Sequence, residues 1–167
     1  EDMHVSPSQG SHFFQNLTSF RVGYFTVNPQ AGEGFIDWEW LDSQFEGAEA
    51  ISGETLTERF LVKNASCWAC PIGCTRVSKT DKVEGEGPEF ETAWAFGAQC
   101  GVDDLEAIIE VNALCNDLGL DTISTGSTIA CAMELSEKGY LASDLRFGRS
   151  DLLARCVEEM AYRHGLG

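Results

Sequence analysis

The segment DDLEAIIEVNALCNDLG, residues 103–119, decides the fold class of this 167-residue chain. Its apolar positions recur near the i, i+3, i+4 spacing that places side chains on one face of an α-helix. Acidic residues open the segment and a glycine closes it, which is a common start and stop pattern for a helix. The segment therefore predicts an amphipathic helix, with its buried face formed by Leu105, Ile108, Ile109, Asn112 and Cys115.

Further helices are predicted on both sides of this segment. STIACAMELSEKG, residues 127–139, ends at a glycine, and SDLLARCVEEMAYRHG, residues 150–165, has an apolar stripe with Ser150 as cap. Thr55 and Glu58 lie at capping-box spacing, which predicts a short helix from about Leu56. The glycine- and charge-rich residues 78–92 predict a loop. We therefore expect residues 43–167 to be mainly α.

The first 42 residues differ in composition from the rest. FRVGYFTV, residues 20–27, alternates in the manner of a β-strand, and FIDWEWL, residues 35–41, predicts a second short strand or a helical turn. We expect residues 1–42 to be a short β-containing segment of separate origin, attached to a helical domain over residues 43–167.

Charge and hydropathy exclude several classes of protein. The formal net charge is −16, which disfavours binding to a nucleic-acid backbone. No run of 18 apolar residues is present, so no membrane-spanning helix is expected. The N-terminal residues lack the basic and apolar regions of a secretory signal, so the seven cysteines are interpreted as cytoplasmic thiols or metal ligands.

Three of those cysteines form the motif CWACPIGC, residues 67–74. Pro71 and Gly73 indicate a loop, and three soft sulfur ligands this close could hold an iron–sulfur cluster or zinc, or be inert. A zinc ribbon would bring a second C-x2-C pair, which the sequence lacks. The four remaining cysteines are isolated, and we interpret them as small buried apolar residues.

Several motifs occur together in one order: CWACPIGCTRVSK, GPEFETAWAFG, NDLGLDTISTGSTIACAMEL and AYRHGLG. Over about residues 45–167 they closely resemble the middle, helical domain of the tungsten-containing aldehyde:ferredoxin oxidoreductases. The resemblance implies oxidation of an aldehyde to a carboxylic acid by tungsten, or molybdenum, held by two pterins. Electrons would leave through a [4Fe–4S] cluster to ferredoxin, and the parent enzyme is a possible homodimer.

The resemblance also implies roles for individual residues. Cys67, Cys70 and Cys74 would be cluster ligands, and the fourth ligand would lie in a C-terminal domain that this chain does not reach. Pterin would be bound by the NDLGLD motif, where Asn116 replaces the usual aspartate and forms only a neutral hydrogen bond. The pterin-binding residues would be Asn116, Gly119, Leu120, Asp121 and Thr122.

The resemblance further implies that one glutamate of GPEFET faces the substrate near tungsten, and we favour Glu91, as a proton acceptor or an orienting group. Some family members hold a further metal at a dimer interface through an E-x-x-H motif. Here Glu110 is followed by Ala113 at the histidine position, so that metal is not expected.

Residues 1–42 resemble the end of the nucleotide-binding domain of phosphoenolpyruvate synthase-like proteins. The chain would then be a fragment of a longer enzyme joined to a kinase-domain-like remnant, and inactive on its own. Two alternatives stay open: a small zinc-stabilised interaction module without redox activity, and a remnant that retains nucleotide binding.

Overall fold

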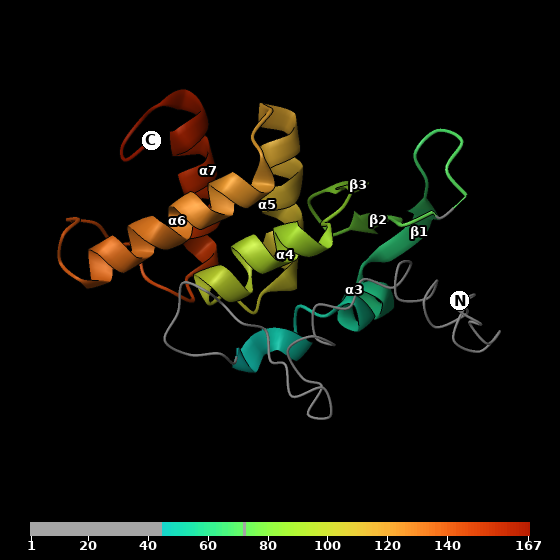
Figure 1. Ribbon diagram of the computed structural model, residues 1–167, viewed down its shortest axis with the longest axis horizontal. Helices are drawn as coiled ribbons and strands as arrows, with labels where there is room; N and C mark the ends of the chain where they lie inside the picture. The colour runs from blue at the N-terminus through green and yellow to red at the C-terminus, as the bar shows by residue number, and fades with distance from the viewer. Residues whose placement is uncertain (1–44, 72) are drawn as a thin grey trace, which may run out of the picture.

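The computed structural model describes residues 45–71 and 73–167, so the strands expected within residues 1–42 lie outside the described residues. Five α-helices and three strands in the described part confirm a mainly α fold with a small β component (Figure 1). The helices are α3 (Gly53–Arg59), α4 (Phe90–Phe96), α5 (Leu105–Leu118), α6 (Thr122–Glu137) and α7 (Leu153–Tyr162), and the strands are β1 (Leu61–Ala65), β2 (Thr75–Lys79) and β3 (Glu84–Glu86). Single 3-10 turns lie at Glu46–Glu49, Ala98–Cys100 and Ser150–Leu152.

Helix α5 confirms the amphipathic pattern from which the fold class was predicted. All five residues of the expected inner face are buried. The helix begins after Asp104, whose side chain accepts a hydrogen bond from the Ala107 N–H at 3.2 Å. It ends at Gly119, where φ is +71°, a conformation that glycine adopts without steric cost.

The helices share one hydrophobic core. Helix α4 packs along α6, and α5 packs along α7, so that the apolar faces of all four meet. Helices α4 and α6 approach closely at Gly126 on α6, where an added Cβ would be 2.8 Å from the backbone carbonyl carbon of Ala95 on α4. Glycine at this position therefore sets the distance between the two helices.

The strands form an antiparallel sheet in the order β1-β2-β3. Ala65 pairs with Thr75 at one end of the β1–β2 hairpin, and Leu61 pairs with Ser78 near the other. Figure 1 shows the sheet beside the helical layer, with α3 next to it. The loop predicted for residues 78–92 is wrong in part, because it contains the end of β2, all of β3 and the start of α4. Strand β3, with the sequence EGE, is short and largely exposed, so a polar segment with a glycine can form it.

The first helix also begins earlier than its capping pattern predicted. Helix α3 starts at Gly53, and Ser52 is the cap: its hydroxyl accepts the Thr55 N–H at 3.1 Å. Two serine/threonine residues three positions apart can both cap a helix, and here the upstream one does. No helix among the described residues is long and apolar enough to cross a membrane.

The packing at Gly126 generates a stability prediction. Gly126→Val should force α4 and α6 apart, and overpacking of this kind costs about 1–3 kcal/mol or more. The measurement is urea unfolding of the 167-residue chain, followed by far-ultraviolet circular dichroism. The matched control is Gly85→Val on β3, where an added Cβ meets nothing within 4 Å. We expect the control to stay within about 0.5 kcal/mol of wild type, and equal losses in the two variants would contradict the packing account.

Candidate redox-cofactor site

The three neighbouring cysteines lie on the loop that joins β1 to β2. Residues 66–74 form this loop, and the Ala65–Thr75 pair of the hairpin closes its base. The Cys70 N–H donates to the Cys67 carbonyl oxygen at 3.0 Å, which makes a tight turn between the first two thiols. Positive φ angles at Ala69 (+58°) and Gly73 (+61°) turn the chain back on itself. The local backbone therefore keeps all three thiols on one short, anchored loop.

The thiols themselves do not converge within the described residues. Cys67 and Cys74 are exposed, Cys70 is half-buried, and all three are free. No group of three metal-ligating side chains is found among the residues that the structure describes. In Figure 1 the loop lies at the outer end of the β1–β2 hairpin, away from the connection between α5 and α6 in the helical layer. The loop and that connection therefore do not form one site in this part of the chain alone.

An arginine lies directly below the cysteine loop. Arg76 on β2 is only 2% exposed, and its Nη1 donates to the Cys74 carbonyl oxygen at 2.9 Å and to Asn64 Oδ1 at 3.3 Å. Burial lowers the pKa of its guanidinium, and the nearby Glu89 and Cys74 act in the opposite direction. The guanidinium stays cationic over the whole physiological range. Sequence reasoning missed Arg76, because TRVSK has no apolar alternation that would place Arg76 and Ser78 on the buried side of a strand.

The two glutamates of GPEFET begin helix α4. Glu89 is the N-cap residue, and Glu91 lies exposed in the first turn, so the predicted loop position of Glu91 is wrong. The Gly87–Pro88 peptide bond before them is cis, and the Gly87 N–H donates to the Arg76 carbonyl oxygen at 2.7 Å. Partial burial raises the pKa of Glu89, while Arg76 acts to lower it. Glu89 is therefore the glutamate of this motif whose charge acts on Arg76.

The NDLGLD motif forms the connection between α5 and α6. The Gly119 N–H donates to the Asn116 carbonyl oxygen at 3.3 Å, and the Leu120 N–H donates to the Cys115 carbonyl oxygen at 2.9 Å. These bonds satisfy the last carbonyl groups of α5. Asp121 then caps α6, with its Oδ2 accepting the Ser124 N–H at 2.7 Å. The interpretation of the motif as a helix end is thus confirmed, and any cofactor role is additional to it.

A hydroxyl pair links this connection to the glutamate motif. The Oγ1 atoms of Thr92 on α4 and Thr122 on α6 are 2.7 Å apart. Thr92 follows Glu91 directly, and Thr122 follows Asp121. The structure therefore brings two of the predicted functional segments together at the starts of α4 and α6.

The other cysteines largely follow the expected packing. Cys100, Cys115 and Cys156 are buried, and burial raises the pKa of the Cys115 thiol to about 11, so the thiol stays protonated. Cys131 differs from the expectation, because it lies exposed on α6. Its position outside the apolar stripe of α6 explains the difference.

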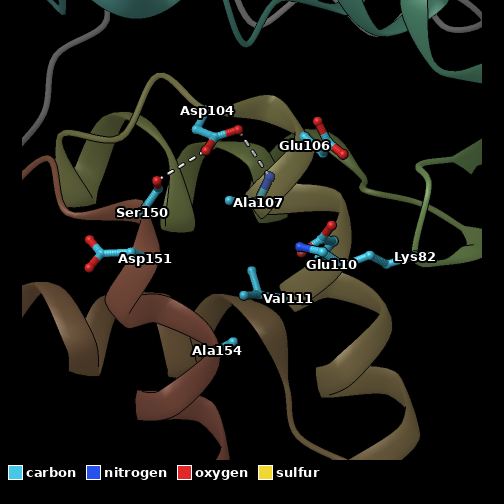
Figure 2. Close-up of a pocket in the computed structure, with 9 residues that line it drawn as sticks. All are labelled: Lys82, Asp104, Glu106, Ala107, Glu110, Val111, Ser150, Asp151 and Ala154. Atoms are coloured by element: carbon cyan, nitrogen blue, oxygen red, sulfur yellow. Dashed lines mark hydrogen bonds and ion pairs between the residues drawn. The ribbon is translucent and has the colours of Figure 1, made fainter.

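A separate acidic cleft lies between α5 and α7, and Figure 2 shows the residues that line it. Asp104 accepts the Ser150 hydroxyl at 3.0 Å, and Glu110 pairs with Lys82 at 2.8 Å. Glu110 is the residue of the incomplete E-x-x-H pattern, and its carboxylate here has a lysine partner. The cleft includes none of the predicted cofactor ligands.

Comparisons with known proteins match most of the chain. The family model described as "Aldehyde ferredoxin oxidoreductase, domains 2 & 3" matches residues 27–167. A tungsten-containing aldehyde ferredoxin oxidoreductase of Thermococcus kodakarensis is 50% identical over 96% of this chain and 26% of its own length. One from Pyrococcus furiosus is 49% identical over 70% of this chain and 20% of its own length. The chain thus spans about a quarter or less of these relatives.

A solved structure of benzoyl coenzyme A reductase is similar in fold. The active-site complex BamBC of benzoyl coenzyme A reductase aligns over 92% of this chain and 22% of its own chain, with a TM-score of 0.59 at 21% identity. The family match begins at residue 27, inside the segment given a separate origin. These comparisons do not show the resemblance of that segment to phosphoenolpyruvate synthase-like proteins, and the domain boundary near residue 42 stays a prediction.

The cap at Asp121 generates a pH prediction. Its hydrogen bonds lower the pKa of the folded carboxyl below the usual value, so its contribution to stability is present above the unfolded pKa of about 3.9. That contribution is lost as the pH falls through the lower, folded pKa. Asparagine caps a helix about as well but does not titrate, so the stability of wild type relative to Asp121→Asn should be constant above about pH 5 and decline as the pH falls from there through the folded pKa.

The measurement is chemical unfolding of both proteins at each pH. Asp117→Asn is the control, because this exposed aspartate lies within α5 and caps no helix. A wild-type advantage that stays constant with pH, or that is the same for the control, would contradict the capping role.

Proposed function

The chain belongs to the aldehyde ferredoxin oxidoreductase family, and on this premise we propose that it is the cofactor-bearing middle part of an enzyme that oxidises aldehydes to carboxylic acids. The observation that supports this most strongly is the anchored loop with three free thiols within the region matched to the family. The relatives from Thermococcus kodakarensis and Pyrococcus furiosus are described as tungsten-containing aldehyde ferredoxin oxidoreductases. We extend that chemistry to this chain as a proposal.

Cys67, Cys70 and Cys74 would be ligands of a [4Fe–4S] cluster. The donor set fits, because thiolates are the ligands of such clusters and all three thiols here are free on one loop. The loop is fixed at its base by the Ala65–Thr75 pair, so only the loop itself has to close for the sulfur atoms to converge. When bound, the cluster would pass single electrons to ferredoxin. Its fourth ligand would come from outside these residues.

The α5–α6 connection would contact a pterin of a tungsten, or molybdenum, bis-pterin cofactor. Asn116, Gly119, Leu120, Asp121 and Thr122 would supply this contact. The αL conformation of Gly119 leaves the connection without a side chain at its sharpest point, where an added Cβ would meet nothing within 4 Å. A carboxylate can accept about four hydrogen bonds, so Asp121 could cap α6 and also accept from pterin N–H groups. These features support the proposal by leaving space and acceptor capacity.

Glu91 would act as proton acceptor or orienting group for the aldehyde reaction. Its carboxylate is exposed in the first turn of α4, next to the hydroxyl pair of Thr92 and Thr122. This places it at the same end of the α4–α6 pair as the proposed pterin contact. An ionised carboxylate within hydrogen-bond reach of a substrate water could take its proton.

The same proposal implies a cellular location, an oligomeric state and the inactivity of the isolated chain. The enzyme would act in the cytoplasm, where seven free cysteines stay reduced. A homodimer is possible for the parent enzyme. The 167-residue chain would not catalyse the reaction alone, because it spans only about a quarter of the relatives it matches. The family match does not favour the alternative of a zinc-stabilised module. The metal content of the reconstituted chain distinguishes this alternative from an iron–sulfur protein.

Anaerobic reconstitution with iron and sulfide tests the cluster proposal. The chain should turn brown and bind roughly four irons, measured by iron and sulfide analysis and by the visible absorption of the cluster. Cys67→Ala, Cys70→Ala and Cys74→Ala should each lose most of this iron. Cys131→Ala is the matched control, because Cys131 is also exposed and free but lies on α6.

A colourless protein that binds one zinc per chain through the same three cysteines would contradict the proposal. Equal iron loss in Cys131→Ala would also contradict it, because the iron would then be bound without regard to the loop.

A further inference from the structure

Arg76 leaves one edge of its guanidinium without a partner. Within the described residues, its Nε and Nη2 atoms are buried and have no hydrogen-bond partner, whereas Nη1 has two. A buried cation with unsatisfied N–H groups is costly, because it has lost water and gained nothing in return. Folded proteins therefore rarely keep such a group unless a bound ligand or an ordered water completes it, and for a cation an anionic ligand is the strongest partner.

The surroundings of Arg76 indicate where that anion lies. Its own strand leads into the cysteine loop, and Nη1 is bonded to the carbonyl oxygen of Cys74. Glu89 is the carboxylate whose charge acts most strongly on Arg76, yet it forms no hydrogen bond to the guanidinium among the described residues. The guanidinium of Arg76 therefore lies at the base of the loop, with Cys74 and Glu89 as its nearest acidic groups.

This position matches the needs of a cluster with thiolate ligands. Such a cluster is anionic, and its sulfur atoms accept hydrogen bonds. The planar guanidinium presents Nε–H and Nη2–H side by side, in a fork that suits an anionic acceptor better than a lysine ammonium does. Sulfur atoms of a cluster held on this loop would supply acceptors for the two groups.

We propose that Arg76 is a positioning residue of the iron–sulfur site, and that its Nε–H and Nη2–H groups donate to sulfur atoms of the cluster held by Cys67, Cys70 and Cys74. The inference rests on the proposed cluster and adds a specific consequence. Reduction adds one electron to the cluster, and a cation with hydrogen bonds to its sulfur atoms stabilises the reduced form. Arg76 therefore raises the reduction potential of the cluster.

The test is a redox titration of the reconstituted 167-residue chain, followed by electron paramagnetic resonance of the reduced cluster. Arg76→Met removes the charge and both N–H groups at similar volume. At a fixed potential we expect about tenfold less reduced cluster relative to oxidised, which corresponds to a lowering of about 59 mV for a one-electron couple. Arg76→Lys keeps the charge but not the fork and should lie between Arg76→Met and wild type.

Asn64→Ala is the matched control. It removes one of the two existing partners of Nη1 without changing the charge, so it perturbs the same arginine structurally. We expect its potential to equal that of wild type. A potential shifted as far in Asn64→Ala as in Arg76→Met would overturn the inference, because the shift would then report general loosening of the loop.

Iron content separates this inference from the cluster proposal. If wild type binds no iron, the cluster proposal fails and the inference fails with it. If wild type and Arg76→Met both bind the full cluster at one potential, only the inference about Arg76 is overturned. If Arg76→Met does not fold, as judged by circular dichroism, Arg76→Lys decides: a lowered potential supports the inference and an unchanged one overturns it.

Discussion

The pairing of β1 with β2 is the constraint on which the proposed site depends. The Ala65–Thr75 pair fixes both ends of the cysteine loop, so three thiols that would otherwise sample a large volume are held within a nine-residue connection, residues 66–74. Closing a short loop in advance removes much of the entropy that ligand convergence would cost. The same strand carries Arg76 to the base of the loop, so the hairpin supplies both the soft ligands and the adjacent cation.

The helical layer brings together the residues proposed for the second part of the site. Gly126 allows α4 and α6 to approach closely, and the hydroxyl pair of Thr92 and Thr122 joins their first turns. Glu91 and the α5–α6 connection consequently lie at one end of the helix pair. The cysteine loop lies elsewhere, at the outer end of the sheet. The sheet and the helix pair would each support one part of the proposed site.

The sequence was sufficient to predict the elements whose signal is local. Helix α5 has a clear apolar period and a terminal glycine, and the order of the motifs identified the family. Other features depend on tertiary contacts and could not be predicted in this way. Strands β2 and β3 are short and polar, so they lack the alternating apolar pattern that marks a half-buried strand. The sequence could not show that Ser52 rather than Thr55 caps α3, because both residues have the same capping chemistry.

In the candidate site, too, some residues could be predicted from the sequence and others only from the fold. The three cysteines and the NDLGLD turn were evident from residue type and spacing. Arg76 was not, because a single arginine in a polar strand gives no sign of burial until the strand pairing is known. The coupling of Glu89 to that arginine likewise requires the fold.

The central claim is that the β1–β2 loop holds an iron–sulfur cluster. Iron K-edge X-ray absorption of the reconstituted chain tests it most directly, because the fine structure identifies the atoms around each iron. The account predicts iron surrounded mainly by sulfur, with other iron atoms in the next shell. A first shell of oxygen and nitrogen without neighbouring iron would contradict it.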